Sequence, residues 1–215
     1  MENIELKRVF TISGALNYMK PDGTYLVPCP CSVLNEFKEN VALVQKEIGS
    51  WNYVKYNGTF LSPKDFREAW EFKNGMAVVM KDVNQYNFLK LDGTFFSQED
   101  FCFALEFSEN VAVVMKKGGM MNYIKLDGTF LTEEDFYITY SFEQGFGRVQ
   151  RQNGLYNYVK PDGTLLSSRD FKEALDFKKT CAKVWIELEN GEDFECRINR
   201  KGKLTDKKGK LININ

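Results

Sequence analysis

One phrase recurs five times at a fixed spacing of 35 residues, and this period constrains the fold more than any other feature. The copies read NYMKPDGT, NYVKYNGT, NFLKLDGT, NYIKLDGT and NYVKPDGT, and they begin at Asn17, Asn52, Asn87, Asn122 and Asn157. No residue is inserted or lost between the first copy and the last. Self-similarity at such a period indicates a repeat protein, in which one unit buries its apolar face only against its neighbours.

Each unit predicts a β-hairpin followed by a short helical turn. Runs such as MAVVMK are apolar and β-branched, as strands are, and the recurrent phrase begins close enough behind them to form a hairpin. Asp-Gly then marks a tight turn, because glycine adopts positive φ without steric cost. Ser62 and Asp65, on either side of Pro63, resemble a capping box, so we expect one or two helical turns there. The equivalent pairs are Ser97 and Asp100, Thr132 and Asp135, and Ser167 and Asp170. Because this acid recurs in every regular unit, capping explains it better than a role as a general acid.

The fold class that follows is mainly β. We predict tandem 35-residue repeats of an antiparallel β-hairpin plus a short helical turn, six hairpins in all, in an open solenoid-like array. A closed, propeller-like ring is the alternative that the period also allows. We expect one repeat domain over residues 1–215, with an atypical N-terminal cap repeat at 1–36 and regular repeats at 37–180. A divergent last hairpin and a basic C-terminal cap occupy 181–215.

Two columns of phenylalanine recur with the period and predict the core. Each buried ring contributes roughly 1.5–3 kcal/mol to stability, and aromatic columns in a repeat usually face inward. A row of aromatic rings that stacks a ligand is the alternative. The columns are Phe66, Phe101, Phe136 and Phe171, and Phe37, Phe72, Phe107, Phe142 and Phe177.

Composition excludes several classes of function. The chain contains no histidine, which removes Ser-His and Cys-His catalytic pairs and every histidine-bearing zinc site. The net charge of −1 indicates no global attraction to nucleic acid or to an acidic membrane. We see no signal peptide and no apolar run long enough to span a bilayer, and the five irregularly spaced cysteines argue against a disulfide framework. These features predict a cytoplasmic protein that does not bind membranes.

Cysteine supplies one local cluster, Cys29-Pro30-Cys31. A C-x-C pair can form half of a thiolate metal site. The repeat register places Cys31 in the column of Phe66, and free cysteine packs as a small hydrophobe. We therefore predict a core role for it, and no metal site.

Cations form two further columns and one cluster. Lys20, Lys55, Lys90, Lys125 and Lys160 precede the glycine turns, and Lys46, Lys81, Lys116 and Arg151 end the first strands. Such rows can follow a series of anionic groups, or they can be solvated and paired with turn aspartates. The candidate anion-binding residues are Lys55, Lys90 and Lys125, with Arg197, Arg200, Lys201, Lys207 and Lys208 of the basic C-terminal segment. That segment can contact nucleic acid or an acidic protein surface, or be merely solvated.

Variable columns are where a partner would be distinguished. One holds Leu16, Trp51, Tyr86, Met121 and Tyr156, and another holds Ser32, Arg67, Cys102, Tyr137 and Lys172. Tryptophan, tyrosine and methionine are enriched at interfaces, so Trp51, Tyr86, Met121 and Tyr156 are the candidate partner-binding residues. Core packing is the alternative role for these four side chains.

These motifs together resemble the bacterial WG-repeat family (WG-containing β repeat). Trp51-Asn52-Tyr53-Val54 through Gly58, then Pro63, Asp65-Phe66, Phe72 and Gly75, follow the order of that family's unit. The chain departs from it because asparagine replaces the glycine of the Trp-Gly pair in every copy, as in a divergent branch. The resemblance implies a β-rich repeat array with an interaction role, and no catalytic residues.

We therefore expect a non-enzymatic protein-binding or scaffold protein with no catalytic residues, cofactor or metal. One alternative is a binder that sequesters a small anionic ligand such as a nucleotide. The other is contact with nucleic acid through the basic C-terminal segment. The sequence does not identify the partner.

Overall fold

The fold of this protein, seen in a computed structural model, consists of strands and turns, and residues 5–212 are described. The chain divides into two compact units, Met1–Phe103 (unit 1) and Ala104–Asn215 (unit 2). The strands of unit 1 are β1 (Lys7–Phe10), β2 (Leu16–Met19), β3 (Val33–Leu34), β4 (Val41–Glu47), β5 (Ser50–Lys55), β6 (Glu68–Ala69), β7 (Met76–Asp82) and β8 (Gln85–Lys90). The division between the units falls within β9 (Phe103–Ala104).

Unit 2 continues the same succession of strands. They are β10 (Val111–Met115), β11 (Met121–Lys125), β12 (Ile138–Thr139), β13 (Gly147–Gln150), β14 (Tyr156–Val159), β15 (Glu173–Ala174), β16 (Cys181–Glu187), β17 (Asp193–Asn199) and β18 (Leu204–Thr205). The six expected antiparallel hairpins are present: β1–β2, β4–β5, β7–β8, β10–β11, β13–β14 and β16–β17. The fold is therefore mainly β and is built from several small antiparallel sheets.

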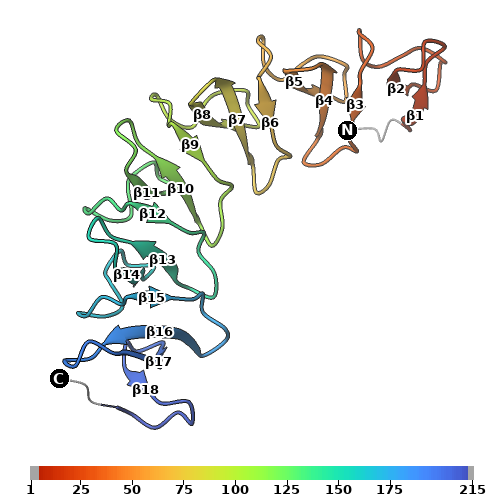
Figure 1. The fold of residues 1–215 in the computed structure, drawn as a ribbon. Helices are drawn as coiled ribbons and strands as arrows, with labels where there is room; N and C mark the ends of the chain where they lie inside the picture. Colours follow the sequence, from red (N-terminus) through yellow and green to blue (C-terminus); the bar gives the residue numbers. More distant parts are fainter. Residues whose placement is uncertain (1–4, 213–215) are drawn as a thin grey trace. The chain divides into compact units, whose positions relative to one another are not determined.

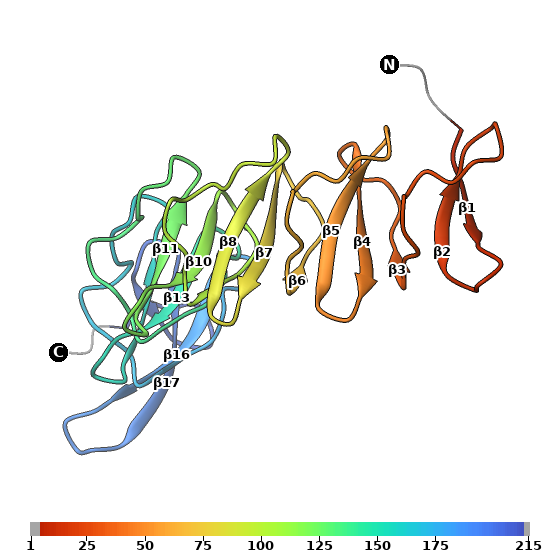
Figure 2. The ribbon, with the colours of Figure 1, turned by 90° about the horizontal axis from the view of Figure 1, so that it is seen from above.

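A single connecting segment covers the edges of two successive sheets. Residues 60–66 lie along β5, with bridges from Val54 to Phe60 and from Trp51 to Phe66, and the same segment then forms β6 against β7. Within unit 1 the hairpins β4–β5 and β7–β8 stand side by side with β6 between them (Figure 1, Figure 2). Exposed sheet edges invite unwanted pairing, and this arrangement covers them with the chain's own backbone.

The expected helical turns are absent from residues 5–212. Residues 62–66 bend and then extend, because Phe66 must exchange both backbone hydrogen bonds with Trp51. Ser62 does bond to the backbone two residues on: its hydroxyl donates to the Lys64 carbonyl at 2.7 Å and accepts from the Lys64 amide at 3.3 Å. The capping-box interpretation was wrong, since the serine stabilises a bend and not a helix.

Apolar side chains from neighbouring hairpins meet between them and form the core. In unit 1 one cluster joins Leu43 and Tyr53 of one hairpin to Val79 and Leu89 of the next. The centres of β4 and β7 are buried on both faces, which explains why their sequences are continuous apolar runs. Both phenylalanine columns pack inward, and only Phe37 among the nine is more than slightly exposed.

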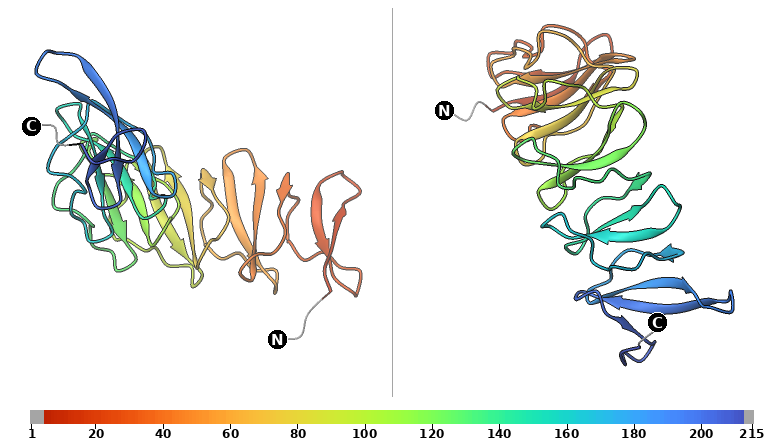
Figure 3. Two further views of the ribbon diagram at one scale, coloured as in Figure 1. Left: turned by 90° about the horizontal axis from the view of Figure 1, so that it is seen from below. Right: turned by 90° about the vertical axis from the view of Figure 1, so that its left-hand side faces the viewer.

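The last hairpin is four residues longer between its framework columns than the others. Cys196 pairs with Val184 as Asn157 pairs with Val149, so Cys196 occupies the recurrent asparagine column. Its loop projects farther than the loops of the other hairpins of unit 2 (Figure 3). In the basic C-terminal segment the short strand β18 pairs with β17, and Leu211 bridges Thr205. The choice between an open array and a ring concerns the placement of the two units and stays a prediction.

Candidate functional site

The recurrent asparagine is a buried hydrogen-bonding hub. The Asn87 side-chain oxygen accepts from the backbone amides of Phe88 and Ser97, at 2.8 and 3.2 Å. Its amide nitrogen donates to the Ser97 carbonyl at 3.0 Å and to the Asp100 carboxylate at 2.8 Å. Asn52 repeats all four bonds, and Asn122 and Asn157 repeat the bonds to the next amide, to the carbonyl and to the aspartate. A buried amide needs all of its partners, so this column fixes the returning segment to its hairpin.

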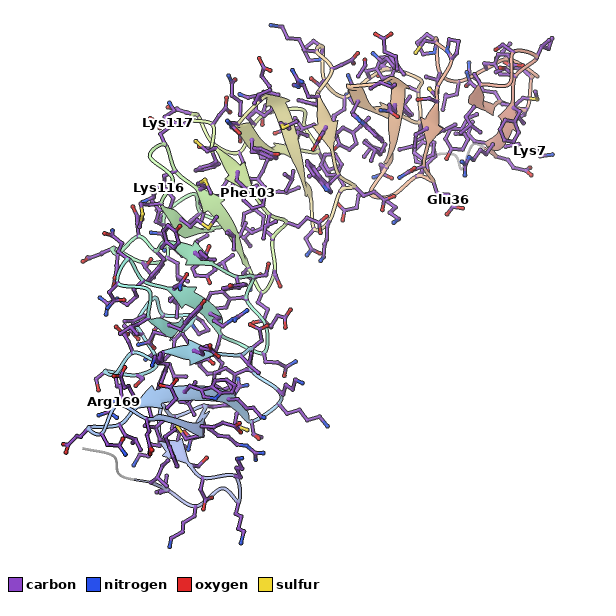
Figure 4. The ribbon with its side chains drawn as sticks, viewed as in Figure 1. Lys7, Glu36, Phe103, Lys116, Lys117 and Arg169 are labelled. Carbon is purple, nitrogen blue, oxygen red and sulfur yellow. The ribbon has the colours of Figure 1, made fainter. Side chains whose placement is uncertain are left out.

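The cations at the ends of the first strands pair with the aspartate column. The pairs are Lys46–Asp65 at 2.7 Å, Lys81–Asp100 and Lys116–Asp135 at 2.6 Å, and Arg151–Asp170 at 2.8 Å. In the first three units the ammonium also lies 3.9–4.5 Å from the centre of a phenylalanine ring: Phe60, Phe95 or Phe130. Figure 4 labels Lys116 at the loop between β10 and β11. These cations and acids bind each other.

Two of these aspartates, Asp65 and Asp135, have a pKa below the ordinary value of the carboxyl group. Burial raises the pKa of Asp135, but hydrogen bonds from Lys116 and Asn122 outweigh it and leave that pKa below its ordinary value. The same holds for Asp65, where the hydroxyl of Ser50 adds a third donor. The column is therefore a structural ion-pair ladder.

The turn lysines lie beside turn aspartates. Lys125 is 3.5 Å from Asp127, and Lys160 is 3.4 Å from Asp162. Hydrogen bonds from Thr94 lower the pKa of Asp92, and the charge of Lys90 lowers it further to a smaller extent. Lys55 differs from the other column members because Asn57 stands where they have an aspartate. Lys55 is therefore the candidate in this column with the least local neutralisation.

The basic C-terminal segment is largely built into the last sheet. The Arg197 guanidinium donates to the Lys207 carbonyl at 3.1 Å, and the Lys207 ammonium lies 3.8 Å from Glu195. Arg200 donates to the Gln144 carbonyl at 2.8 Å and lies 5.0 Å above the Phe146 ring. Lys201 and Lys208 are exposed in turns. The structure does not gather the five residues into one free cationic surface.

The aromatic column is half-buried. Trp51, Met121 and Tyr156 each pack against a core cluster, and the Met121 sulfur accepts from the Thr139 amide at 3.4 Å. Tyr86 instead contacts two other aromatic rings, Trp70 at 6.3 Å and Phe103 at 5.7 Å between ring centres. Trp70 is 37% exposed and was not a candidate on sequence. Its column varies through Asn35, Trp70, Leu105, Tyr140 and Leu175, and that variation was the available signal.

Two of the five cysteines, Cys31 and Cys196, are buried core residues. Cys31 is buried, and desolvation together with the neighbouring Cys29 raises the pKa of its thiol to about 12. Cys196 is also buried, and burial raises its pKa to about 11. No group of three cysteine, aspartate or glutamate side chains in residues 5–212 is arranged to hold a metal ion.

The sequence comparison identifies one unit. Residues 51–83 match the family model of the WG containing repeat. This WG-type repeat runs from the start of β5 to the loop after β7, so it includes the asparagine hub and the connecting segment. No curated protein sequence matches the chain significantly.

Solved structures resemble the chain at low similarity. The computationally designed Ika8 protein has a TM-score of 0.42 and 14% identity over 95% of this chain and 70% of that one. BamB from Moraxella catarrhalis has a TM-score of 0.39 and 9% identity over 100% and 74%. The WD40 beta propeller domain of Doa1 has a TM-score of 0.34 and 12% identity over 93% and 84%. Residues 5–212 also contain no helix of the length and apolarity that crossing a membrane requires.

Proposed function

We propose that this chain is a non-enzymatic binding or scaffold protein whose partner is another protein. The observation that carries the proposal is the aromatic surface of unit 1, defined by Trp70, Tyr86 and Phe103. Aromatic side chains at partly exposed positions supply much of the binding energy at protein interfaces.

In each 35-residue repeat, one set of residues holds the fold together and another set faces outward, and this separation supports the proposal. The asparagines, aspartates and cations that hold the sheets together recur from unit to unit, and the asparagines are buried. The outward residues of the connecting segments vary instead, from Arg67 and Trp70 in one unit to Tyr137 and Tyr140 in another. A constant framework that displays variable side chains is typical of repeat proteins that bind partners.

The test is capture of partners by the tagged full chain from a lysate of its source organism, compared with the double variant Trp70→Ser/Tyr86→Ser. Both substitutions keep the hydrogen bonds to the framework, because Trp70 accepts from the Tyr53 hydroxyl and Tyr86 exchanges bonds with Phe101 through backbone atoms. We expect a partner whose capture falls at least tenfold in the variant, as loss of an interface hot spot would give. The matched control is Ile48→Ser, which removes an exposed apolar side chain from the β4–β5 loop.

Equal capture by wild type and double variant, with both folded by circular dichroism, would reject this surface. Nucleic acid in place of protein, lost with Lys201→Ser/Lys208→Ser, would transfer the function to the basic C-terminal segment. Those substitutions keep β18, which a truncation after Lys201 would remove from the last sheet.

A further inference from the structure

A groove in unit 2 has the lining of a site for a cationic side chain. Its volume is about 380 Å³, within the range of small-ligand sites. The floor is apolar and is formed by Val111, Leu131 and Phe142, with Leu126 and Pro161 beside them.

The charged residues of the rim favour a cation. Glu109 and Asp127 oppose the single cation Lys125, which is 3.5 Å from Asp127. One carboxylate oxygen of Glu109 accepts from the Gly145 amide at 2.8 Å, and this bond holds the acid at the rim. The rim therefore carries a net charge of −1 when Glu109, Lys125 and Asp127 are ionised.

One repeat farther on, the chain fills the equivalent place with its own arginine. Adding 35 to Glu109, Val111 and Phe142 gives Gln144, Phe146 and Phe177. The position equivalent to Pro161 is Arg200, because the last hairpin is four residues longer than the others. Proline leaves the first place open, whereas arginine occupies the second.

The contacts of Arg200 show what this place binds. Its guanidinium lies over the Phe146 ring, which itself stacks on Phe177 at 4.2 Å. It donates to the backbone carbonyls of Gln144 at 2.8 Å and Lys179 at 3.2 Å. A planar cation with several donors satisfies both the aromatic surface and the turn carbonyls.

We propose that the groove of Glu109, Val111, Phe142 and Pro161 binds an arginine side chain of a partner protein. The open groove has Val111 in place of Phe146 and so keeps only the Phe142 ring, but Glu109 in place of the neutral Gln144 offers a guanidinium a carboxylate. Lys125 does not prevent binding, since Asp127 pairs with it, as Asp162 pairs with the equivalent Lys160 of the next repeat. The site belongs to unit 2 and shares no residue with the aromatic surface of unit 1.

The test is an NMR titration of the full chain with N-acetyl-arginine-methylamide, with the neutral citrulline analogue as the matched probe. We expect saturable shift changes at Val111, Leu126 and Phe142 with the arginine probe alone. Glu109→Gln keeps the acceptor for Gly145 and removes the charge, so affinity should fall about fivefold, as for replacing a charged hydrogen bond by a neutral one. Glu133→Gln, an exposed acid outside the groove, should leave affinity unchanged.

Pro161→Arg gives an independent test, because it recreates the self-filled state. Position 161 is an exposed turn position whose column already holds Tyr56, Leu91 and Arg200, so the variant should fold. We expect it to abolish probe binding. Equal shifts with the citrulline probe, or unchanged affinity in Pro161→Arg, would overturn the proposal. Neither result bears on the capture experiment at Trp70 and Tyr86.

Discussion

Glycine in the recurrent Asp-Gly turn does more than allow a positive φ. Gly163 has φ +82°, and a Cβ there would lie 2.1 Å from the Leu131 carbonyl oxygen of the preceding unit. Gly58 approaches Leu26 and Gly202 approaches Leu166 in the same way, at 2.5 and 2.2 Å. In each of these repeats the turn therefore packs directly on the backbone of the preceding repeat. Any side chain at the glycine would push the two repeats apart.

Two glycines of equal φ separate these effects. Gly154 also has φ +82°, but a Cβ there meets nothing within 4 Å. We expect Gly154→Ala to cost about 1–2 kcal/mol through the left-handed backbone alone. Gly163→Ala should cost roughly 1–3 kcal/mol more, because the added methyl overpacks the contact. Urea unfolding of both variants gives the comparison, and equal losses would mean that the approach to Leu131 is unimportant.

The asparagine hub gives the second prediction for single residues. Asn122→Ala removes the partners of the buried Tyr123 amide and Thr132 carbonyl, so we expect a loss of about 2–4 kcal/mol. Asn153→Ala removes an exposed turn bond to Leu155 and should cost under about 1 kcal/mol. Thermal unfolding followed by circular dichroism measures both. A loss for Asn122→Ala no larger than for Asn153→Ala would show that the hub is dispensable.

The conformation of the connecting segment depends more on its pairing with two successive hairpins than on its own sequence propensity. The segment after each Asp-Gly turn pairs first with its own hairpin and then with the next, so it is extended where a capping box predicts helix. The acid of that segment reaches back across 19 residues to a cation, as Asp135 does to Lys116. The two backbone hydrogen bonds that Phe136 exchanges with Met121 require the extended form, and together with this ion pair they outweigh a local capping signal worth about 1 kcal/mol.

This ion-pair ladder predicts a dependence on pH. The pKa of Asp135 is lowered in the folded chain, so its ionisation stabilises the fold above the unfolded pKa of about 3.9. That stabilisation is lost as pH falls through the lowered pKa. Asp135→Asn should therefore reduce stability at pH 7 and flatten the loss of stability below pH ~4. Urea midpoints between pH 2.5 and 7 measure this, and parallel curves for variant and wild type would contradict it.

Hairpins stack on one another within unit 1 and within unit 2. The last hairpin, β16–β17, carries charged side chains on its outward face. Lys183 and Arg197 pair across β16 and β17 in the columns that hold Val113 and Tyr123 in an earlier hairpin. Glu195 lies 3.4 Å from Lys183 on the same face. A charged face of this kind does not favour the binding of further apolar surfaces.

Apolar residues at positions 183 and 197 should make copies of the chain associate through this face. We expect Lys183→Val/Arg197→Tyr to raise the average mass in solution as protein concentration increases, because an apolar face would be left uncovered. Lys201→Ser, an exposed change outside these columns, is the control. Light scattering after size exclusion measures the mass, and a profile identical to wild type would refute the capping role.

The sequence by itself determined the period, the six hairpins, the positive-φ turns and the buried phenylalanine columns. These features follow from local preferences and from alternation along a few residues, which an amino-acid pattern encodes directly. It also placed Cys31 in the core, through the register alone. It did not reveal that Asn87 and Asp100 bind each other, although both columns were visible.

Only the tertiary structure decided what those columns bind. Whether Asp65 caps a helix or holds Lys46, and whether Arg200 is free or lies on Phe146, depends on groups that lie far apart along the chain. The groove at Glu109 likewise requires the turn that holds Glu109 and the distant Phe142, which follows the next Asp-Gly turn along the chain. Such contacts arise when hairpins stack, because stacking brings together side chains and carbonyls that no local preference relates.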